Sequence, residues 1–222
     1  MQKIIQITED GSHTIHVPEI GVTYHSFHGA ITESMHVYIE AGLNYLLETQ
    51  KRSSLNILEM GFGTGLNALL SLQWAIKNSI SIKYTAIDSD PLNPSEYNVL
   101  NYGNLLQMSH ELLALHDAEW NLSVRIQELF SLEKQKIDLR NFESTQQFQC
   151  VFFDAFSPVV QPELWTTEIF QKLFAVLEPG GILVTYCSKS TVRKAMQDAG
   201  FQVSKIPGPR GKREMVRAIR LL

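Results

Sequence analysis

The feature that most constrains the fold is an apolar run that ends in three closely spaced glycines, within Leu55–Asn67 (LNILEMGFGTGLN). The run has the length of a buried strand, and the apolar residues after the glycines repeat with the spacing of one helix face. Glycine adopts backbone angles that residues with a β-carbon avoid, so this turn can bring bare backbone close to a ligand. A strand, a glycine turn and a helix in this order predict the ligand-binding edge of a parallel α/β sheet.

Alternating strand and helix patterns continue from this turn to the end of the chain, which is typical of a doubly wound sheet. Residues 1–50 differ, because they predict two short strands and one helix, and fifty residues bury too little surface to be stable alone. We therefore expect an N-terminal extension (1–50) packed on a main domain (51–222). Seven strands are expected in the main domain, at residues 55–60, 81–88, 122–128, 148–156, 181–188, 201–206 and 214–222.

The composition narrows the class of protein further. With 44% hydrophobic and 19% charged residues, the chain fits a globular protein and not a disordered one. It has no apolar stretch long enough to cross a membrane and no pattern of a secretory signal at its N-terminus, so we expect a cytoplasmic protein without a membrane partner. Two cysteines, Cys150 and Cys187, cannot form a structural zinc site by themselves, and no metal site is expected.

The charge is distributed unevenly along the chain. Residues 1–188 carry 10 Lys or Arg against 21 Asp or Glu, whereas residues 189–222 carry 9 against 2. A basic cluster of this kind suits contacts with phosphate groups of a nucleic acid, although it is also compatible with an ordinary solvated surface. Its members are Lys189, Arg193, Lys194, Lys205, Arg210, Lys212, Arg213, Arg217 and Arg220.

The spacing of the glycines indicates which ligand the turn binds. Gly61, Gly63 and Gly65 follow a G-x-G-x-G spacing, whereas a turn that binds a dinucleotide is expected to read G-x-G-x-x-G. Glu59 stands just before the turn, where a negative charge would repel a pyrophosphate but would suit an ammonium or sulfonium group. These two observations favour S-adenosylmethionine as the cofactor.

Acidic residues also stand at the expected ends of the next three strands. Asp88 is placed to accept hydrogen bonds from ribose hydroxyls. Glu128 is expected to contact the adenine amino group, with Leu129 as apolar cover, and Asp154 ends the fourth strand. The full set of expected cofactor contacts is Glu59, Gly61, Phe62, Gly63, Thr64, Gly65, Asn67, Asp88, Ser89, Glu128, Leu129 and Asp154.

On these residues the sequence resembles the class I methyltransferases, and one family among them closely. This is the tRNA (5-methylaminomethyl-2-thiouridine)-methyltransferase family, which comprises stand-alone MnmD proteins and the methyltransferase half of bifunctional MnmC. The stretches that carry the resemblance, in order, are EMGFGTGLN, FFDAFSPVVQPELW, LEPGGILVTYCS, VRKAMQDAGF and GKREMV.

The resemblance implies a Rossmann-like α/β fold with a seven-stranded, mostly parallel sheet whose last strand is antiparallel. It also implies transfer of a methyl group from S-adenosylmethionine to the 5-aminomethyl nitrogen of the wobble uridine, in the anticodon stem-loop of tRNA. One departure is Gln127-Glu128, where the family pattern has Gly-Asp. No second nucleotide loop is seen, so we expect the stand-alone form, with a separate enzyme supplying the aminomethyl precursor. No oligomer is indicated.

The expected chemistry assigns roles to the residues around Asp154. An amine attacks a methyl group only as its free base, and Asp154 is expected to orient the amine and accept its proton. Most of the rate enhancement should come from alignment of the two reactants. Phe156 and Trp165 offer aromatic faces for a flipped base, although Trp165 fits a core position equally well. Glu33 is expected to close over the cofactor or the base, and the phosphates are assigned to Lys189, Arg193, Lys194, Lys212 and Arg213.

Other functions remain open from the sequence. The chain could be an N-methyltransferase that acts on a small amine or a protein, or an RNA methyltransferase that uses Cys187 to methylate carbon 5. An NAD-dependent dehydrogenase is disfavoured by the glycine spacing and by Glu59. A tRNA-binding module without catalytic activity would not need the acids at the strand ends.

Overall fold

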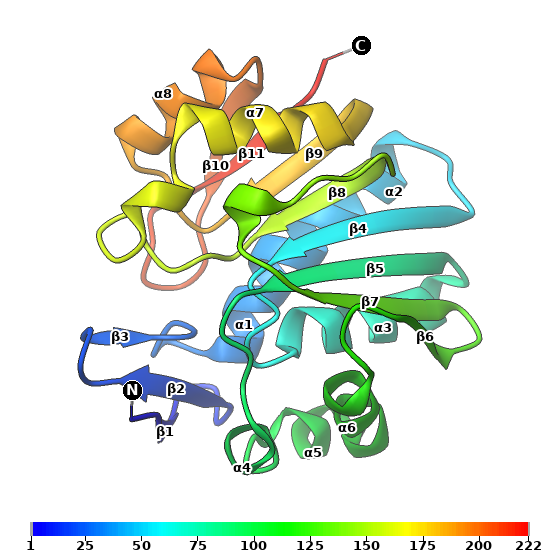
Figure 1. Ribbon diagram of the computed structural model, residues 1–222, viewed down its shortest axis with the longest axis vertical. Helices are drawn as coiled ribbons and strands as arrows, with labels where there is room; N and C mark the ends of the chain where they lie inside the picture. The colour runs from blue at the N-terminus through cyan, green and yellow to red at the C-terminus, as the bar shows by residue number, and fades with distance from the viewer. Residues whose placement is uncertain (1, 222) are drawn as a thin grey trace.

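The large sheet is the centre of the molecule in this computed structural model, which describes residues 2–221 (Figure 1). Its strands are β4 (Ser54–Met60), β5 (Ser81–Asp88), β6 (Ser123–Gln127), β7 (Phe130–Lys136), β8 (Phe148–Phe153), β9 (Leu177–Thr185), β10 (Gln202–Pro207) and β11 (Glu214–Ile219). Their spatial order is β10-β11-β9-β8-β4-β5-β7-β6. The chain runs outward from β4 through β5 to β7 and then returns to β8 on the other side of β4. The strand order therefore reverses between β4 and β8, where a sheet of this kind binds its ligands.

The directions of the strands match the expected methyltransferase topology at one edge and extend it at the other. Strands β7, β5, β4, β8 and β9 are parallel, and β11 is antiparallel to both of its neighbours, as expected for the last strand. The sheet has eight strands and not seven, because β6 pairs antiparallel with β7 at the far edge.

The expectation that residues 122–128 form the third core strand is wrong. This stretch is the edge strand β6, and the core position beside β5 belongs to β7. The sequence FSLEKQK of β7 does not look like a buried strand. Its buried side chains are Phe130, Leu132 and Lys134, which alternate with polar residues, and one of the three is itself a lysine. The buried Lys134 directs its ammonium group at the carbonyl of His116 and lies over the rings of Phe62 and Trp120.

Helices cover both faces of the sheet. The chain from Ala30 to Thr49 forms one continuous helical segment of α1 (Ala30–Ser34), the π-helical η1 (Met35–Asn44) and α2 (Tyr45–Thr49). Gly42 allows η1 to approach the sheet closely, since a β-carbon there would lie 3.3 Å from the ring of Phe152. Figure 1 shows α1 and α3 (Leu66–Asn78) behind the sheet and α7 (Thr167–Val176) in front of it, near α8 (Ser190–Asp198).

Shorter helical turns connect these elements. They are α4 (Pro94–Tyr97), α5 (Tyr102–Leu106), α6 (Ser109–Asp117), η2 (Leu139–Asn141) and η3 (Pro162–Leu164). In residues 2–221 no helix is both long and apolar enough to span a bilayer.

The first strands form a small antiparallel sheet in the order β1 (Ile4–Ile7), β2 (His13–Val17) and β3 (Val22–Thr23). Side chains of α5 and its cap hold this sheet: the hydroxyl of Tyr102 donates to the carbonyl of His13, and the amide of Asn101 donates to the carbonyl of Gly11 at 2.9 Å. The small sheet therefore lies against the loops at the carboxyl ends of β4 and β5.

Candidate active site

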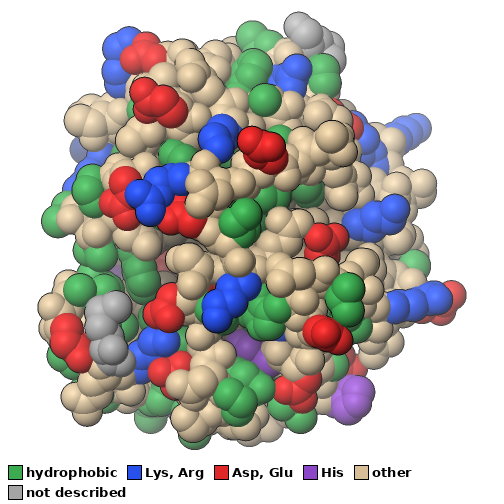
Figure 2. Space-filling view, in the orientation of Figure 1, with side chains coloured by type: hydrophobic (Ala, Val, Ile, Leu, Met, Phe, Trp, Pro, Cys, Tyr) green, Lys and Arg blue, Asp and Glu red, His purple; other side chains and the backbone are tan. Residues whose placement is uncertain are grey.

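The glycine turn between β4 and α3 forms the floor of a cavity at the switch point of the sheet. Gly61 and Gly63 have φ angles of 90° and 47°, which only glycine adopts without strain. A β-carbon on Gly61 would lie 3.1 Å from the carbonyl oxygen of Asp154, so a side chain would crowd the end of β8. Figure 2 shows this face of the molecule hollowed between the N-terminal strands and the loop after β8.

The cavity draws its walls from several elements. The carboxyl ends of β4, β5 and β8 contribute backbone and acids, the segment after β7 contributes Asp138, and the segment after β3 contributes Tyr24 and His25. Phe156 and Tyr24 meet edge to face across it, with ring centroids 5.1 Å apart. The expected residues Gly61, Phe62, Gly63, Thr64, Asn67, Asp88, Ser89 and Asp154 all line this cavity.

Asp88 is held in place by two backbone amides. Its Oδ2 accepts a hydrogen bond from the amide of Gly63, and its Oδ1 accepts one from the amide of Asp90, each at 2.9 Å. Burial raises the pKa of Asp88, and the two amide donors partly oppose that shift. The carboxylate thus joins the end of β5 to the glycine turn.

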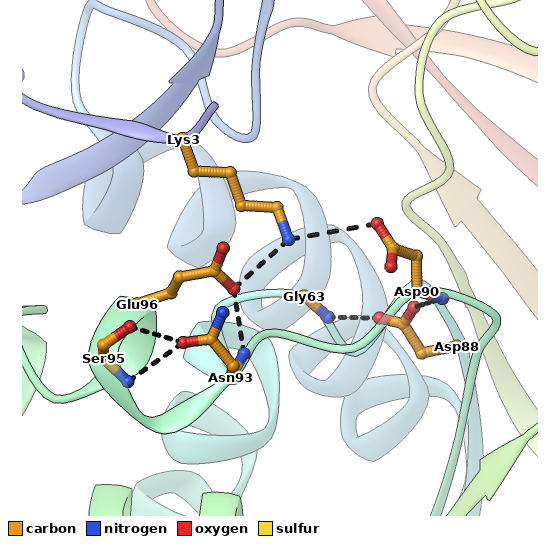
Figure 3. Close-up of polar contacts among 7 residues, drawn as sticks. All are labelled: Lys3, Gly63, Asp88, Asp90, Asn93, Ser95 and Glu96. Atoms are coloured by element: carbon orange, nitrogen blue, oxygen red, sulfur yellow. Dashed lines mark hydrogen bonds and ion pairs between the residues drawn. The ribbon is translucent and has the colours of Figure 1, made fainter. Parts of the chain in front are cut away.

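Lys3 extends this arrangement to the N-terminal sheet (Figure 3). Its ammonium group lies 3.3 Å from the carboxylate of Glu96 and 3.9 Å from that of Asp90, and only a tenth of the side chain is exposed. Glu96 also accepts a hydrogen bond from the amide of Asn93, which closes the first turn of α4. Lys3, which directly precedes β1, therefore bridges the two acids that flank the loop after Asp88.

The amide of Asn67 links two buried acids. Its Nδ2 donates to Oε1 of Glu59 at 2.9 Å and to Oδ2 of Asp154 at 2.8 Å. Its own Oδ1 is buried without a hydrogen-bond partner, as is Oε2 of Glu59. Burial raises the pKa of Glu59 well above its ordinary value, so a free anion there is disfavoured in the absence of a cation.

The position of Glu59 corrects one expectation from the sequence. Its side chain is completely buried behind the glycine turn, and Asn67 takes the place at the cavity wall. The side chain of Asn67 therefore lies between the cavity and Glu59.

Asp154 lies at the end of β8, with some of its surface facing the cavity. Burial raises its pKa to about 7, opposed by the nearby hydroxyl of Tyr38 and by Asn67. Glu33 raises this pKa further and Lys212 lowers it. Asp154 can thus change its protonation state near neutral pH, as a proton acceptor for an amine requires.

Glu33 and Lys212 form an ion pair with each other beside this carboxylate. Glu33 also accepts a hydrogen bond from the amide of Ser26 at 2.8 Å, and the ammonium of Lys212 lies 4.1 Å from the centre of the Tyr186 ring. Lys212 is therefore neutralised by a buried partner, and its expected role as a free phosphate contact is not supported by its position.

The two aromatic residues expected to stack on a base have different positions. Phe156 lines the cavity, whereas Trp165 is 6% exposed and packs edge to face on Phe153 in the core. The indole nitrogen of Trp165 donates to the carbonyl of Phe156 at 2.8 Å. The expected stacking role of Trp165 is wrong, because its ring is covered by protein, and it instead fixes the backbone that carries Phe156.

Glu128 and Leu129 lie outside the cavity. They form the connection between β6 and β7, at the amino end of β7, whereas the cavity is at its carboxyl end. The acid at the carboxyl end is Asp138, two residues after β7, and the amide of Ile137 donates to the carbonyl of Asp88 at 3.2 Å. The assignment of the adenine contact to Glu128 followed from the wrong third strand and is corrected to Asp138 as the candidate.

Two histidines that the sequence did not point to hold the glycine turn. The Nε2 of His25 lies 2.7 Å from the hydroxyl of Thr64, and the Nε2 of His116 lies 3.0 Å from its carbonyl oxygen. Burial lowers the pKa of both rings to about 4, so both are neutral at pH 7. No sequence signal identified them, because they come from distant segments that meet only in the fold.

The basic cluster of the last segment separates into two groups. Lys194, Lys205, Arg210 and Lys212 pair with carboxylates, and Arg220 donates to three backbone carbonyls at the end of α7 and the start of β9. The guanidinium of Arg217 lies 3.4 Å from the centre of the Tyr45 ring. Among residues 2–221, Lys189, Arg193 and Arg213 form no ion pair with a carboxylate.

The residues around the cavity fit S-adenosylmethionine. The glycines of the turn leave room for a ligand beside the backbone, Asp88 offers a carboxylate next to the turn, and Asp154 offers a second one at the end of β8. Among the described residues, no cluster of three or more His, Cys, Asp or Glu side chains is arranged to hold a metal ion.

The parallel sheet with its reversed strand β11, together with a glycine turn and an acid at the next strand end, defines a class I methyltransferase. The chain belongs to the family described as S-adenosyl-L-methionine-dependent methyltransferase, which it matches over residues 96–220. The resemblance inferred from the sequence motifs is thereby confirmed at the level of enzyme class and cofactor. A dehydrogenase is not favoured by any of these matches.

Similar proteins come from several bacteria. The chain is 30% identical to the tRNA 5-methylaminomethyl-2-thiouridine biosynthesis bifunctional protein MnmC of Marinobacter nauticus, covering 90% of this chain and 34% of that protein. The protein of the same name from Nitrosospira multiformis is 28% identical, with 88% and 34% covered. The chain spans about a third of the length of these relatives. The crystal structure of MnmC2 from Aquifex aeolicus superimposes with a TM-score of 0.80 at 27% identity, covering 98% of this chain and 70% of that one.

Proposed function

We propose that this methyltransferase acts on tRNA and methylates the 5-aminomethyl nitrogen of the wobble uridine, with or without a 2-thio group. The relatives of similar sequence are named for the biosynthesis of this nucleoside, which supports the substrate class. The observation that carries the chemistry is Asp154, a carboxylate with a pKa of about 7 at the end of the cofactor cavity. Such a group can hold an amine and take up its proton near neutral pH.

The cofactor residues divide by the part of the ligand that each suits. We assign the ribose hydroxyls to Asp88 and the adenine amino group to Asp138, and the backbone of the glycine turn passes beneath the ligand. Asn67 lies at the cavity wall and links Asp154 to Glu59 behind it. In this arrangement the two buried acids are stabilised by the positive charge that arrives with the ligand.

The proton transfer follows from the position of Asp154. Bound S-adenosylmethionine supplies an activated methyl group, so that a nitrogen–carbon bond forms as the carbon–sulfur bond breaks and its electron pair remains on sulfur. Asp154 accepts a hydrogen bond from the amine, which orients the nitrogen lone pair, and then takes the proton released as the amine becomes alkylated. Asn67 keeps the carboxylate fixed by donating to its Oδ2.

The proposed partner is the anticodon stem-loop. Lys189, Arg193 and Arg213 are the cations of the basic segment best placed to contact phosphates, because no carboxylate neutralises them within residues 2–221. A different active site must first expose the aminomethyl group, since the residues here serve methyl transfer to an existing amine. A tRNA substrate places the proposed reaction in the cytoplasm.

The test is methylation of defined tRNA. Purified protein is incubated with S-adenosylmethionine and tRNA that carries 5-aminomethyluridine or its 2-thio form, and the digested nucleosides are analysed by mass spectrometry. Gain of one methyl group on that nucleoside is expected, and Asp154→Asn should reduce the rate by about 10²–10⁴-fold, the range of general base catalysis. Methylation of small amines or proteins, with tRNA left unchanged, would support the alternative substrate class instead.

A further inference from the structure

Two segments that are far apart in the sequence form a rim beside the cavity, which we define as residues 26–29 and 209–213. The first part is held rigidly: the amide of Glu9 donates to the carbonyl of Phe27 at 2.9 Å, and the amide of Gly29 donates to the carbonyl of Ser26 at 3.2 Å. The amide of Ser26 is bound by Glu33. The backbone that carries Phe27 is therefore fixed on both sides.

The second part of the rim is the tip of the β10–β11 hairpin, and it is docked on the first. Arg210 lies 3.1 Å from the carboxylate of Glu9, and Lys212 pairs with Glu33. The ring of His28 packs directly on Gly211, where a β-carbon would come within 2.2 Å of it. The two parts thus form one continuous surface and do not move independently.

Phe27 stands out on this rim because its side chain is 55% exposed. The other large hydrophobic side chains exposed within residues 2–221 are aliphatic, so Phe27 is the aromatic one among them. It lies two residues after His25, which lines the cavity. Two residues of chain span at most about 7 Å, so Phe27 is at the edge of the cavity.

The charges next to Phe27 suit a polyanion. Arg210 has 70% of its side chain exposed, and Arg213 is exposed without a carboxylate partner in the described part of the chain. An aromatic face beside exposed cations is the arrangement with which proteins bind single-stranded nucleic acid, because bases stack on the ring while cations neutralise phosphates. A folded protein partner would gain little from a single exposed ring.

We propose that Phe27 stacks on an unpaired base that neighbours the methylated nucleotide, while Arg213, unpaired within residues 2–221, contacts an adjoining phosphate. This inference rests on the proposed function and specifies how that site holds its substrate. The ring acts by keeping the loop open and in register, so that the target nucleotide can enter the cavity toward Asp154. Duplex RNA offers no such base and gains nothing from the ring.

The experiment compares Phe27→Ala with Phe27→Trp and with Ile76→Ala. Ile76 is 50% exposed and lies near the end of α3 that is remote from the glycine turn, which makes it a matched control. Affinity for a labelled anticodon stem-loop is measured by fluorescence anisotropy, with a duplex of equal length in parallel. Binding of S-adenosylhomocysteine by calorimetry verifies that each variant is folded.

Phe27→Ala should weaken stem-loop binding by about 5- to 150-fold, the range for loss of one stacked base, and should leave duplex binding and cofactor binding unchanged. Phe27→Trp and Ile76→Ala should bind as the wild type does. Equal affinity of Phe27→Ala and wild type for the stem-loop, with tRNA methylation intact, would overturn this inference alone. A wild-type protein that neither binds nor methylates the tRNA would overturn the proposed function and this inference with it.

Discussion

Asp154 is the proposed proton acceptor of the site. Burial raises its pKa, and side chains from several elements shift that pKa further. Tyr38 from η1 and Asn67 from α3 lower its pKa, Glu33 from α1 raises it, and Lys212 from the β10–β11 hairpin lowers it. Asp154 in turn contributes to the raised pKa of Glu59 in β4, and Tyr186 after β9 is also close enough to be affected. The value of about 7 is therefore a property of the assembled site.

The pH dependence of the reaction should show the effect of the Tyr38 hydroxyl on the pKa of Asp154. Because the hydroxyl of Tyr38 lowers the pKa of Asp154, Tyr38→Phe should raise it and move the acidic limb of kcat/KM to higher pH. The loss of activity should be greatest below pH 7 and small at pH 9. The substrate amine titrates identically with both enzymes, so it does not contribute to the difference. Tyr97→Phe, on the distant α4, should show an unshifted profile; a profile unchanged in Tyr38→Phe would remove this hydroxyl from the mechanism.

The same carboxyl group should cost stability above neutral pH. Its pKa is raised on folding from 3.8 to about 7, so the folded state keeps the proton while the unfolded state loses it. The contribution of Asp154 to the free energy of unfolding is therefore fully present below pH 4 and is lost as the pH rises to about 7. At pH 8 the Asp154→Asn variant should be more stable than wild type by a free energy of unfolding on the order of 2–4 kcal/mol, and should therefore melt at a higher temperature. At pH 4 the two proteins should differ little. Calorimetric melting at the two pH values tests this, and equal melting temperatures at pH 8 would contradict it.

At the scale of single elements, the identity of the third core strand determines which acid lies at the edge of the cavity. The pattern LSVRIQE predicts the third core strand, but tertiary contacts place β7 in that position instead. The buried face of β7 includes Lys134, whose charge is accommodated by a carbonyl and two aromatic rings. Propensity could not reveal this, because the compensation comes from residues far along the chain.

Because β7 and not β6 is the third core strand, Asp138 and Glu128 should differ in their effect on cofactor affinity. Asp138→Asn should weaken binding of S-adenosylhomocysteine by about 10-fold, as expected for the loss of a hydrogen bond to a charged group. Asparagine can still accept the hydrogen bond from the amide of Arg140 that starts η2, so the local backbone should be kept. Glu128→Gln should leave the affinity unchanged in the same calorimetric titration. The opposite outcome would return the adenine contact to Glu128.

Much of the site could be predicted at this scale for a physical reason. The glycine turn, Asp88 and Asp154 follow directly from strand ends, and the structure brings them into one cavity. Tyr24 and His25 line the cavity, whereas Tyr38 and Lys3 lie beside acids in its wall. All four were missed, because the packing of the N-terminal segment brings them there. The position of Trp165 in the core was equally open, because an aromatic residue at the start of a helix suits either environment.

At the scale of the whole molecule, the N-terminal segment and the large sheet are joined at the side of the cavity that Asp88 lines. Lys3 neutralises Asp90 and Glu96, and Asp90 supports Asp88 through its backbone amide (Figure 3). Lys3, just before the first strand, therefore supports a loop at the edge of the cavity.

Removal of this charge should loosen the cofactor site. Lys3→Met leaves Asp90 and Glu96 without their shared cation, so the loop after β5 should become more mobile and the Kd for S-adenosylhomocysteine should rise about 5- to 10-fold, corresponding to about 1–1.4 kcal/mol. Lys83→Met, which removes an exposed lysine from β5, serves as the control. Calorimetry at low salt measures both. An unchanged Kd in Lys3→Met would show that the loop is held without this lysine.

The contact between residues 26–29 and the β10–β11 hairpin also has a consequence during translation, because the hairpin is synthesised last. A nascent chain that has not reached Arg210 already contains the glycine turn, Asp88 and Asp154, yet the wall against which His28 and Glu33 pack does not exist. The entrance is completed only when the final hairpin emerges from the ribosome. A prematurely terminated product would retain these residues but lack β11, the strand that joins β9 to β10 in the large sheet.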